Sequence, residues 1–118
     1  MLSGQIRSPE DLPPGDYRRN LPRFQADNFV HNLTLVDRVR KIAEEKRVSA
    51  GQLALAWVLA QGECVVPIPG TRRIAHLQEN LGALDVTLTA EDLARLDEAA
   101  PPDGTRGDRY ADMSTVDA

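Results

Sequence analysis

Residues 53–60 are apolar without interruption. A helix formed over such a run has no polar face, so protein has to cover it on every side. Ser49 and Gln52 come just before the run and match the capping-box pattern, in which each side chain bonds the backbone N–H of the other residue. We therefore predict a buried helix that begins at Ser49 and ends at Gly62, with Trp57 in the core.

A second apolar run, residues 64–68, is short and rich in β-branched side chains. Such a run is typical of a strand in a parallel sheet that is covered on both faces. Pro67 lacks the N–H that a sheet ladder needs, which is tolerable where a strand ends. Cys64 would then be a small buried apolar residue. Because one strand cannot form a sheet, this pattern predicts a piece of a larger α/β structure.

Three further helices are predicted from apolar residues spaced three and four apart. The first covers about residues 28–46, with Asp27 as its N-cap. The next starts after Thr71 as N-cap and closes at Gly82. A fourth starts at Thr89, where an acidic variant of the capping box occurs, and stops before the Pro101–Pro102 pair.

The flanking segments contain no periodic pattern. Residues 1–26 are rich in proline and arginine and are expected to form an irregular loop. Residues 103–118 are polar, and we expect an extended or mobile tail. Tyr17 is expected to pack within the loop, and His31 to lie on the surface of the first helix.

The composition excludes several classes of protein. The formal net charge of -4 argues against nucleic acid as the main partner. A single cysteine excludes a disulfide framework and a thiolate zinc site, and we expect no metal site. No apolar run approaches the roughly 18 residues of a membrane span, and no signal peptide is evident, so a cytoplasmic protein is expected.

The stretch with the clearest chemistry lies where the predicted strand ends and a helix opens. A helix N-terminus presents free N–H groups and partial positive charge, and Thr71, Arg72 and Arg73 stand there. Together they favour an anion site, best suited to a phosphate. Glu79 and Asn80, about two turns further on, are placed to hydrogen-bond a base. The alternative is an ordinary turn with two solvated arginines, because neither a Walker loop nor a GxGxxG fingerprint is present.

Residues 51–59, 66–71 and 79–80, at this spacing, resemble the aldo-keto reductases. The resemblance extends from about residue 4 to residue 110 and includes residues 21–24 and 107–110. It implies an α/β fold, the (β/α)₈ TIM barrel, of which this chain would be the mostly helical C-terminal part. Residues 1–26 would be a loop, 27–102 the helices and last barrel strand, and 103–118 a tail.

The resemblance also implies an NADPH site. The loop residues Pro69, Gly70, Thr71 and Arg72 match the segment that holds the 2′-phosphate. Gly70 and Thr71 replace the Lys-Ser of better-known members, which leaves Arg72 as the expected phosphate partner. His76 stands where many members have an arginine over that phosphate or the adenine. Glu79 and Asn80 match the pair that binds the adenine.

The family's catalytic Asp, Tyr, Lys and His are not matched, so no catalytic residue is assigned. We expect cofactor binding for a carbonyl/alcohol oxidoreductase, with a small carbonyl substrate only where the missing barrel half is present. The isolated chain is expected to be inactive and able to self-associate. A catalytically silent truncated fragment and a small helical interaction module remain as alternatives.

Overall fold

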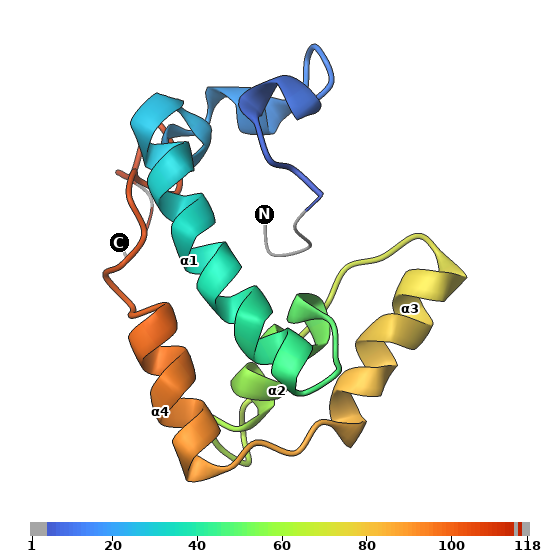
Figure 1. The fold of residues 1–118 in the computed structure, drawn as a ribbon. Coiled ribbons are helices and arrows are strands. Elements are labelled where there is room, and N and C mark those ends of the chain that lie inside the picture. Colours follow the sequence, from blue (N-terminus) through green and yellow to red (C-terminus); the bar gives the residue numbers. More distant parts are fainter. Residues whose placement is uncertain (1–4, 115, 117–118) are drawn as a thin grey trace.

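The computed structural model describes residues 5–114 and 116 (Figure 1). It contains four α-helices: α1 (Ala26–Glu45), α2 (Ala50–Leu59), α3 (Ile74–Leu81) and α4 (Ala90–Ala99). Short 3-10 helices lie between them: η1 (Pro9–Asp11), η2 (Tyr17–Asn20), η3 (Pro22–Phe24) and η4 (Gly82–Asp85). The prediction of four α-helices is confirmed.

Both predicted capping boxes are present. Ser49 Oγ accepts from the Gln52 N–H at 3.1 Å, and Gln52 Oε1 accepts from the Ser49 N–H at 3.0 Å. At α4, Thr89 Oγ1 accepts from the Asp92 N–H at 3.1 Å, and Asp92 Oδ2 accepts from the Thr89 N–H at 2.9 Å. These reciprocal bonds satisfy donors that a helix start leaves free, which is why the sequence pattern locates the two starts well.

The start of α1 was predicted incorrectly. Its N-cap is Gln25, which makes no side-chain capping bond, and Asp27 lies inside the first turn. A carboxylate there still suits the positive end of the helix. Phe29 is fully buried and stacks on Phe24 of η3, with ring centroids 6.0 Å apart. Apolar packing against η3 therefore accompanies a start that no side chain caps.

The core is aliphatic and lies between α1, α2 and α4. It is formed by Val39, Ile42, Ala43, Leu53, Leu96 and Ala99, with Val48, Ala50, Trp57 and Leu88 packed against it. Lys46 at the end of α1 and Asp92 in the first turn of α4 form an ion pair of 2.7 Å at its edge. Trp57 belongs to this core as predicted, although its side chain is only partly buried.

The predicted strand is not formed, and no strand is present in residues 5–114 and 116. Residues 66–70 run without regular structure, and Val66 and Ile68 are 73% and 96% exposed. Cys64 is exposed instead of buried. A strand needs the hydrogen-bond partners of a neighbouring strand, and no other described segment supplies them.

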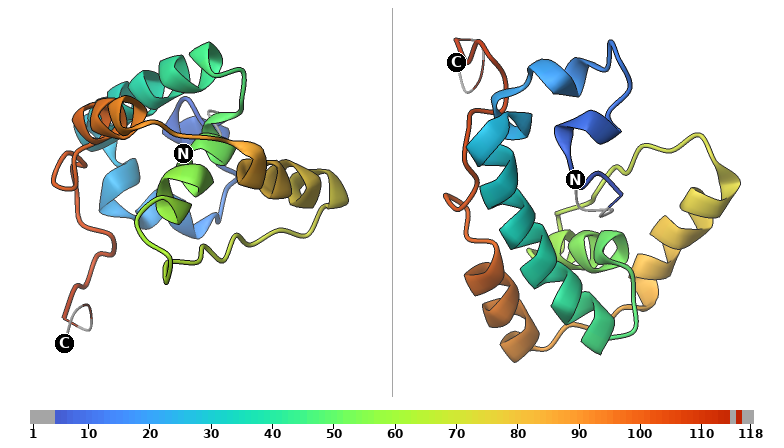
Figure 2. Two further views of the ribbon diagram at one scale, coloured as in Figure 1. Left: turned by 90° about the horizontal axis from the view of Figure 1, so that it is seen from below. Right: turned by 45° about the horizontal axis from the view of Figure 1, so that its top comes forward.

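Helix α2 is less covered than its sequence predicts, because only Leu53 and Ala56 are buried. Helix α3 packs on α2 and η4 and extends away from α1 and α4, and it has no buried residue (Figures 1 and 2). Ile74, Leu77 and Leu81 are all exposed on it. Within the described part of the chain, no helix combines the length and the apolar content that crossing a bilayer requires.

The segment after α4 is more ordered than predicted, since it returns along α1 to the start of that helix (Figure 1). The Asn32 amide, only 2% exposed, pairs with the backbone of Arg106. His31 Nε2 lies 2.9 Å from the Gly104 carbonyl oxygen, so His31 is a tail contact and not a free surface residue. Arg23 Nε donates to the Gly107 carbonyl at 3.1 Å. Residues 104–107 are therefore docked, whereas the sequence predicts an extended or mobile segment.

Gly107 lies close to the backbone of η3. Its φ is +82°, and a Cβ placed there would lie 2.7 Å from the Pro22 carbonyl carbon. A left-handed backbone and a close approach to another backbone both favour glycine. Gly107 therefore allows the tail to touch η3 directly.

Candidate functional site

A cavity of about 320 Å³ lies beside α3. Five of the seven predicted site residues line it: Gly70, Thr71, His76, Glu79 and Asn80. The remaining described lining residues are Gln5, Ser49, Ala50 and Gly51. Pro69 and Arg72 are not part of this lining and are exposed. The structure thus brings five of the predicted phosphate-loop and adenine residues to one place, and Arg72 directly follows one of them, Thr71, in the sequence.

The loop before α3 is shaped by Thr71. Its hydroxyl oxygen accepts from the Arg73 N–H at 3.2 Å. The N-cap of α3 is Arg73 and not Thr71, and no side chain caps the helix. The predicted start is therefore displaced by two residues, because Thr71 forms a local turn instead of a cap. The N–H groups of the first turn consequently have no side-chain acceptor, a feature that suits an anionic ligand.

Helix α2 positions the far side of the cavity through Gln52. The Gln52 Oε1 closes the capping box, and the Gln52 Nε2 donates to the Glu79 carbonyl at 3.0 Å. A Cβ at Gly82 would overlap this side-chain amide, so glycine leaves room for the tie between α2 and α3. Sequence reasoning gave Gln52 only a capping role and Gly82 only a terminating role. No local pattern signals that the two meet.

The acidic member of the cavity is Glu79. Hydrogen bonding from the Ser49 hydroxyl, and then from the His76 ring, lowers the pKa of the Glu79 carboxyl below its ordinary value. His76 Nδ1 lies 3.3 Å from Glu79 Oε2, and both side chains are about half exposed. The two residues are about one helical turn apart, and both line the cavity that Thr71 also lines.

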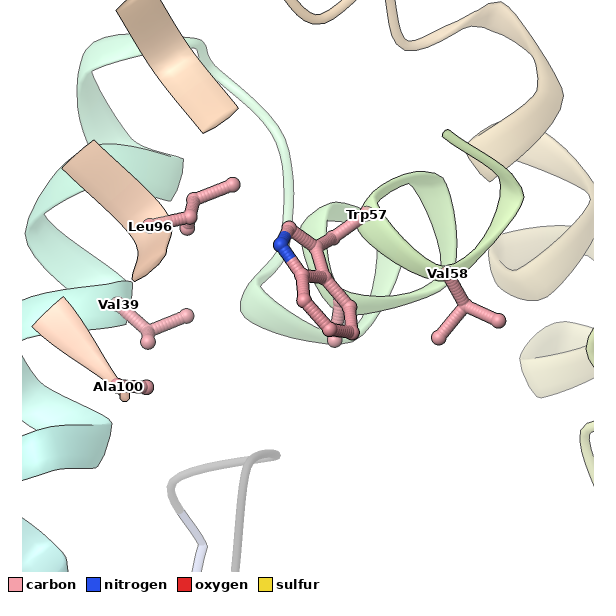
Figure 3. Close-up of a pocket in the computed structure, with 6 residues that line it drawn as sticks. Val39, Trp57, Val58, Leu96 and Ala100 are labelled. Atoms are coloured by element: carbon pink, nitrogen blue, oxygen red, sulfur yellow. The ribbon is translucent and has the colours of Figure 1, made fainter. Parts of the chain in front are cut away.

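A second cavity, of about 260 Å³, is apolar. Figure 3 shows Val39, Trp57, Val58, Leu96 and Ala100 around it, and Ala54 completes the lining. The Trp57 indole N–H donates to Asp97 Oδ1 at 3.0 Å at its edge. Its described lining offers no acid, base or nucleophile.

The tyrosines lie away from the cavity beside α3. Tyr17 is 65% exposed and Tyr110 is 42% exposed, and neither is among the described residues that line that cavity. Tyr17 therefore does not pack within its loop as predicted. In the described residues, no three His, Cys, Asp or Glu side chains come together in a way that could hold a metal ion.

Comparison with known proteins supports one family. The Aldo/keto reductase family profile matches residues 1–101. The aldo-keto reductase yakc of Schizosaccharomyces pombe, whose name specifies NADP(+), is 47% identical over 109 residues, which is 92% of this chain and 32% of that relative. The aldo-keto reductase str7 of Strobilurus tenacellus is 43% identical over 116 residues, covering 98% of this chain and 34% of the relative.

A plant relative shows a similar identity over a similar part of its length. The probable aldo-keto reductase 1 of Glycine max is 45% identical over 101 residues, which is 86% of this chain and 29% of the relative. The chain spans about a third of the length of these three curated relatives. Since the family profile covers most of the sequence and agrees with the predicted resemblance, the chain belongs to the aldo/keto reductase family.

Proposed function

We propose that this chain forms the part of an NADPH site that holds the adenosine and its 2′-phosphate. The observation that carries the proposal is the convergence of Gly70, Thr71, His76, Glu79 and Asn80 on one cavity. The relative from Schizosaccharomyces pombe, whose name specifies NADP(+), supports the choice of dinucleotide. The whole protein would be an oxidoreductase that interconverts a carbonyl and an alcohol.

The donor set fits a phosphate monoester. The first-turn N–H groups of α3 lack a side-chain cap, and the Thr71 hydroxyl stands just before them. Arg72 directly follows Thr71 and is exposed, so its guanidinium would be available to form charge-assisted hydrogen bonds to an anion. Pro69 would fix the direction from which the loop enters the site.

The other end of the cavity fits an adenine. Glu79 offers carboxylate oxygens, and Asn80 offers both a donor and an acceptor, which together match the exocyclic amine and ring nitrogens of a purine. The Gln52 bond to the Glu79 carbonyl holds this part of α3 against α2. NADPH would supply the hydride, and these residues would bind and orient its adenosine end.

We place the chain in the C-terminal part of a (β/α)₈ barrel. The supporting observation is a set of exposed apolar side chains on α3 and the segments around it: Val65, Val66, Ile68, Ile74, Leu77, Leu81 and Leu84. Such a surface is typical of one that further protein covers. Residues 64–68 would become the last barrel strand once neighbouring strands pair with them.

The proposal is tested by titrating the chain with NADPH and NADH and following fluorescence. Arg72→Ala is expected to weaken NADPH binding about tenfold or more and to change NADH binding little, because a charge-assisted contact contributes roughly 1.5–3 kcal/mol. Arg73→Ala is the matched control, since it removes the same charge from the adjacent position, where the backbone is extended and successive side chains point to opposite sides. Equal losses for both cofactors, or a larger loss from Arg73→Ala, would show that the phosphate lies elsewhere.

Catalysis is assigned to no residue of this chain. Reduction of a carbonyl requires a proton donor to the carbonyl oxygen, and the sequence contains no match to the family's catalytic Asp, Tyr, Lys and His. The 118-residue chain alone is therefore expected not to oxidise NADPH in the presence of aldehydes. Turnover that persists through further purification would contradict this.

A further inference from the structure

The capping box of α2 also reaches the end of α3. Ser49 and Gln52 satisfy each other's backbone N–H groups at the start of α2. In addition, the Ser49 hydroxyl hydrogen-bonds to the Glu79 carboxyl, and the Gln52 Nε2 donates to the Glu79 carbonyl at 3.0 Å. The same two side chains therefore fix the start of one helix and hold a residue near the end of another.

The capping box determines how the Gln52 amide is oriented. Its Oε1 accepts from the Ser49 N–H at 3.0 Å, so the other end of the amide, which can only donate, is directed to α3. Glu79 lies in the last turn of α3, where an α-helix leaves its carbonyl groups without an intrahelical partner. The Gln52 amide thus supplies a donor at a place where the helix end has an acceptor to satisfy.

This bond joins two walls of the cavity. The start of α2 contributes Ser49, Ala50 and Gly51 to the described lining, and the end of α3 contributes Glu79 and Asn80. Helix α3 has no buried residue, so apolar burial does little to fix its position against α2. A directed hydrogen bond between the two helices therefore has a large share in setting the distance between the walls.

Gly82 leaves the space that the Gln52 amide occupies. A Cβ at Gly82 would lie 2.4 Å from the Gln52 Nε2. The φ of Gly82 is −61°, an ordinary helical value, so the backbone itself would accept alanine. Gly82→Ala would consequently displace the end of the Gln52 side chain and leave the backbone of α3 unstrained.

We propose that Gln52 is a positioning residue for the base: its bond to Glu79 holds the end of α3 at the distance from α2 at which the site selects adenine over hypoxanthine. The inference rests on the proposed function, which assigns the adenine to Glu79 and Asn80. Adenine presents an exocyclic amine to the Glu79 carboxylate, whereas hypoxanthine has a carbonyl oxygen in that position. Gln52 touches neither base and acts through Glu79.

The experiment titrates the 118-residue chain calorimetrically with NADPH and with deamino-NADPH, its hypoxanthine analogue. The measured quantity is the ratio of the two dissociation constants. A variant that only lowers the fraction of folded chain weakens both ligands by the same factor and leaves this ratio unchanged, so the ratio separates positioning from a general effect on stability.

Two variants break the bond in different ways. Gln52→Glu keeps an acceptor for the Ser49 N–H, since glutamate also completes a capping box, but it loses the donor to Glu79. Gly82→Ala displaces the amide without adding a charge. Gln61→Glu is the matched control, because Gln61 Nε2 likewise donates to a backbone carbonyl at 3.0 Å, that of Trp57, and lies outside the described lining.

We expect wild type to prefer NADPH over its hypoxanthine analogue by about fivefold or more, as the loss of one hydrogen bond predicts. Gln52→Glu and Gly82→Ala should each reduce this preference to about twofold or less, whereas Gln61→Glu should keep it. Circular dichroism checks that each variant retains its helices.

The results that would overturn the inference are distinguishable from failure of the cofactor site. If wild type prefers NADPH and either Gln52→Glu or Gly82→Ala keeps that preference, Gln52 does not position the base and the cofactor site stands. Loss of the preference in Gln61→Glu as well would show that the effect does not come from the bond to Glu79. If wild type binds neither ligand, or binds both equally, the assignment of adenine to Glu79 and Asn80 is wrong, and the inference falls with it.

Discussion

The side-chain amide of Asn32 pairs with both backbone groups of Arg106. Its Nδ2 donates to the Arg106 carbonyl at 2.9 Å, and its Oδ1 accepts from the Arg106 N–H at 2.8 Å. Nδ2 also donates to the Arg23 carbonyl at 3.1 Å. One buried side chain thus connects α1, η3 and the segment that follows α4.

Replacing this amide should release the segment. Asn32→Ala is expected to lower the free energy of unfolding by about 2 kcal/mol, because buried backbone groups lose their partners. The measurement is urea unfolding, combined with amide hydrogen exchange at Arg106. Asn28→Ala is the control: Asn28 makes a single bond, to the Pro22 carbonyl, and should cost about 1 kcal/mol without exposing Arg106. Equal effects of the two variants would contradict this role.

Gly107→Ala tests the contact of the same segment with η3. A Cβ would overlap the backbone of Pro22, and φ is positive, so both strain and displacement are expected. Gly15→Ala is the matched control, since its φ of +86° is similar and nothing lies within 4 Å of the added Cβ. We expect Gly107→Ala to cost at least about 1 kcal/mol more than Gly15→Ala in urea unfolding. An equal loss of stability in the two variants would mean that the close approach of Gly107 to Pro22 adds nothing to the effect of the substitution.

The Lys46–Asp92 pair predicts an acid-sensitive step in stability. Hydrogen bonding from Lys46, and then from the Thr89 backbone, lowers the pKa of the Asp92 carboxyl from its ordinary value to about 2. A carboxyl whose pKa is lower in the folded protein than in the unfolded chain stabilises the fold at pH values above its unfolded pKa. This stability is lost as the pH falls from about 4 to about 2. Allowing for solvent screening, we expect a loss of about 1–2 kcal/mol.

Asp92→Asn should remove this part of the acid transition in pH-dependent thermal unfolding. Asp16→Asn is the control. The pKa of the Asp16 carboxyl is also lowered to about 2, chiefly by Arg18. Arg18 is only two residues away from Asp16, however, so this ion pair does not connect two separate elements of the fold. If Asp92→Asn lost stability at acidic pH to the same extent as wild type, the Lys46–Asp92 ion pair would not stabilise the fold.

The exposed apolar side chains around α3 predict self-association of the isolated chain. Ile68 is 96% exposed and Ile74 is 77% exposed. Ile68→Lys should lower both the sedimentation coefficient and the binding of a hydrophobic dye. Val30→Lys, at a 64% exposed position on α1, should change neither. A compact monomer that does not bind the dye in wild type would refute the prediction.

The sequence predicted those parts of the fold that depend on neighbouring residues. Ser49 and Thr89 start their helices as expected, because a capping box is complete within four residues. The strand over residues 64–68 was predicted from apolar content, but its formation depends on pairing with distant segments. The docked tail was missed because nothing near Asn32 in the sequence indicates a partner at Arg106.

The grouping of three cavity residues was predictable for the same reason. Glu79 and Asn80 follow His76 by three and four residues, so a helix over this stretch brings them close to His76. The opposite wall was not predictable, because Ser49 and Gly51 reach the cavity only through the packing of α2 on α3. Pro69 and Arg72 were also predicted as site residues, and both lie outside the described lining of the cavity.

The Asn32 pairing has a consequence for the order of events in folding. Asn32 and Arg106 are 74 positions apart in the chain. On the ribosome, α1 emerges long before Arg106 exists, so the bonds between the Asn32 amide and Arg106 cannot form until all of α2, α3 and α4 has been synthesised. Closing so long a loop is entropically costly, and the shorter-range packing of α1 against α2 has no need to wait for it. Docking of residues 104–107 is therefore expected as a late kinetic phase that follows collapse of the helical core.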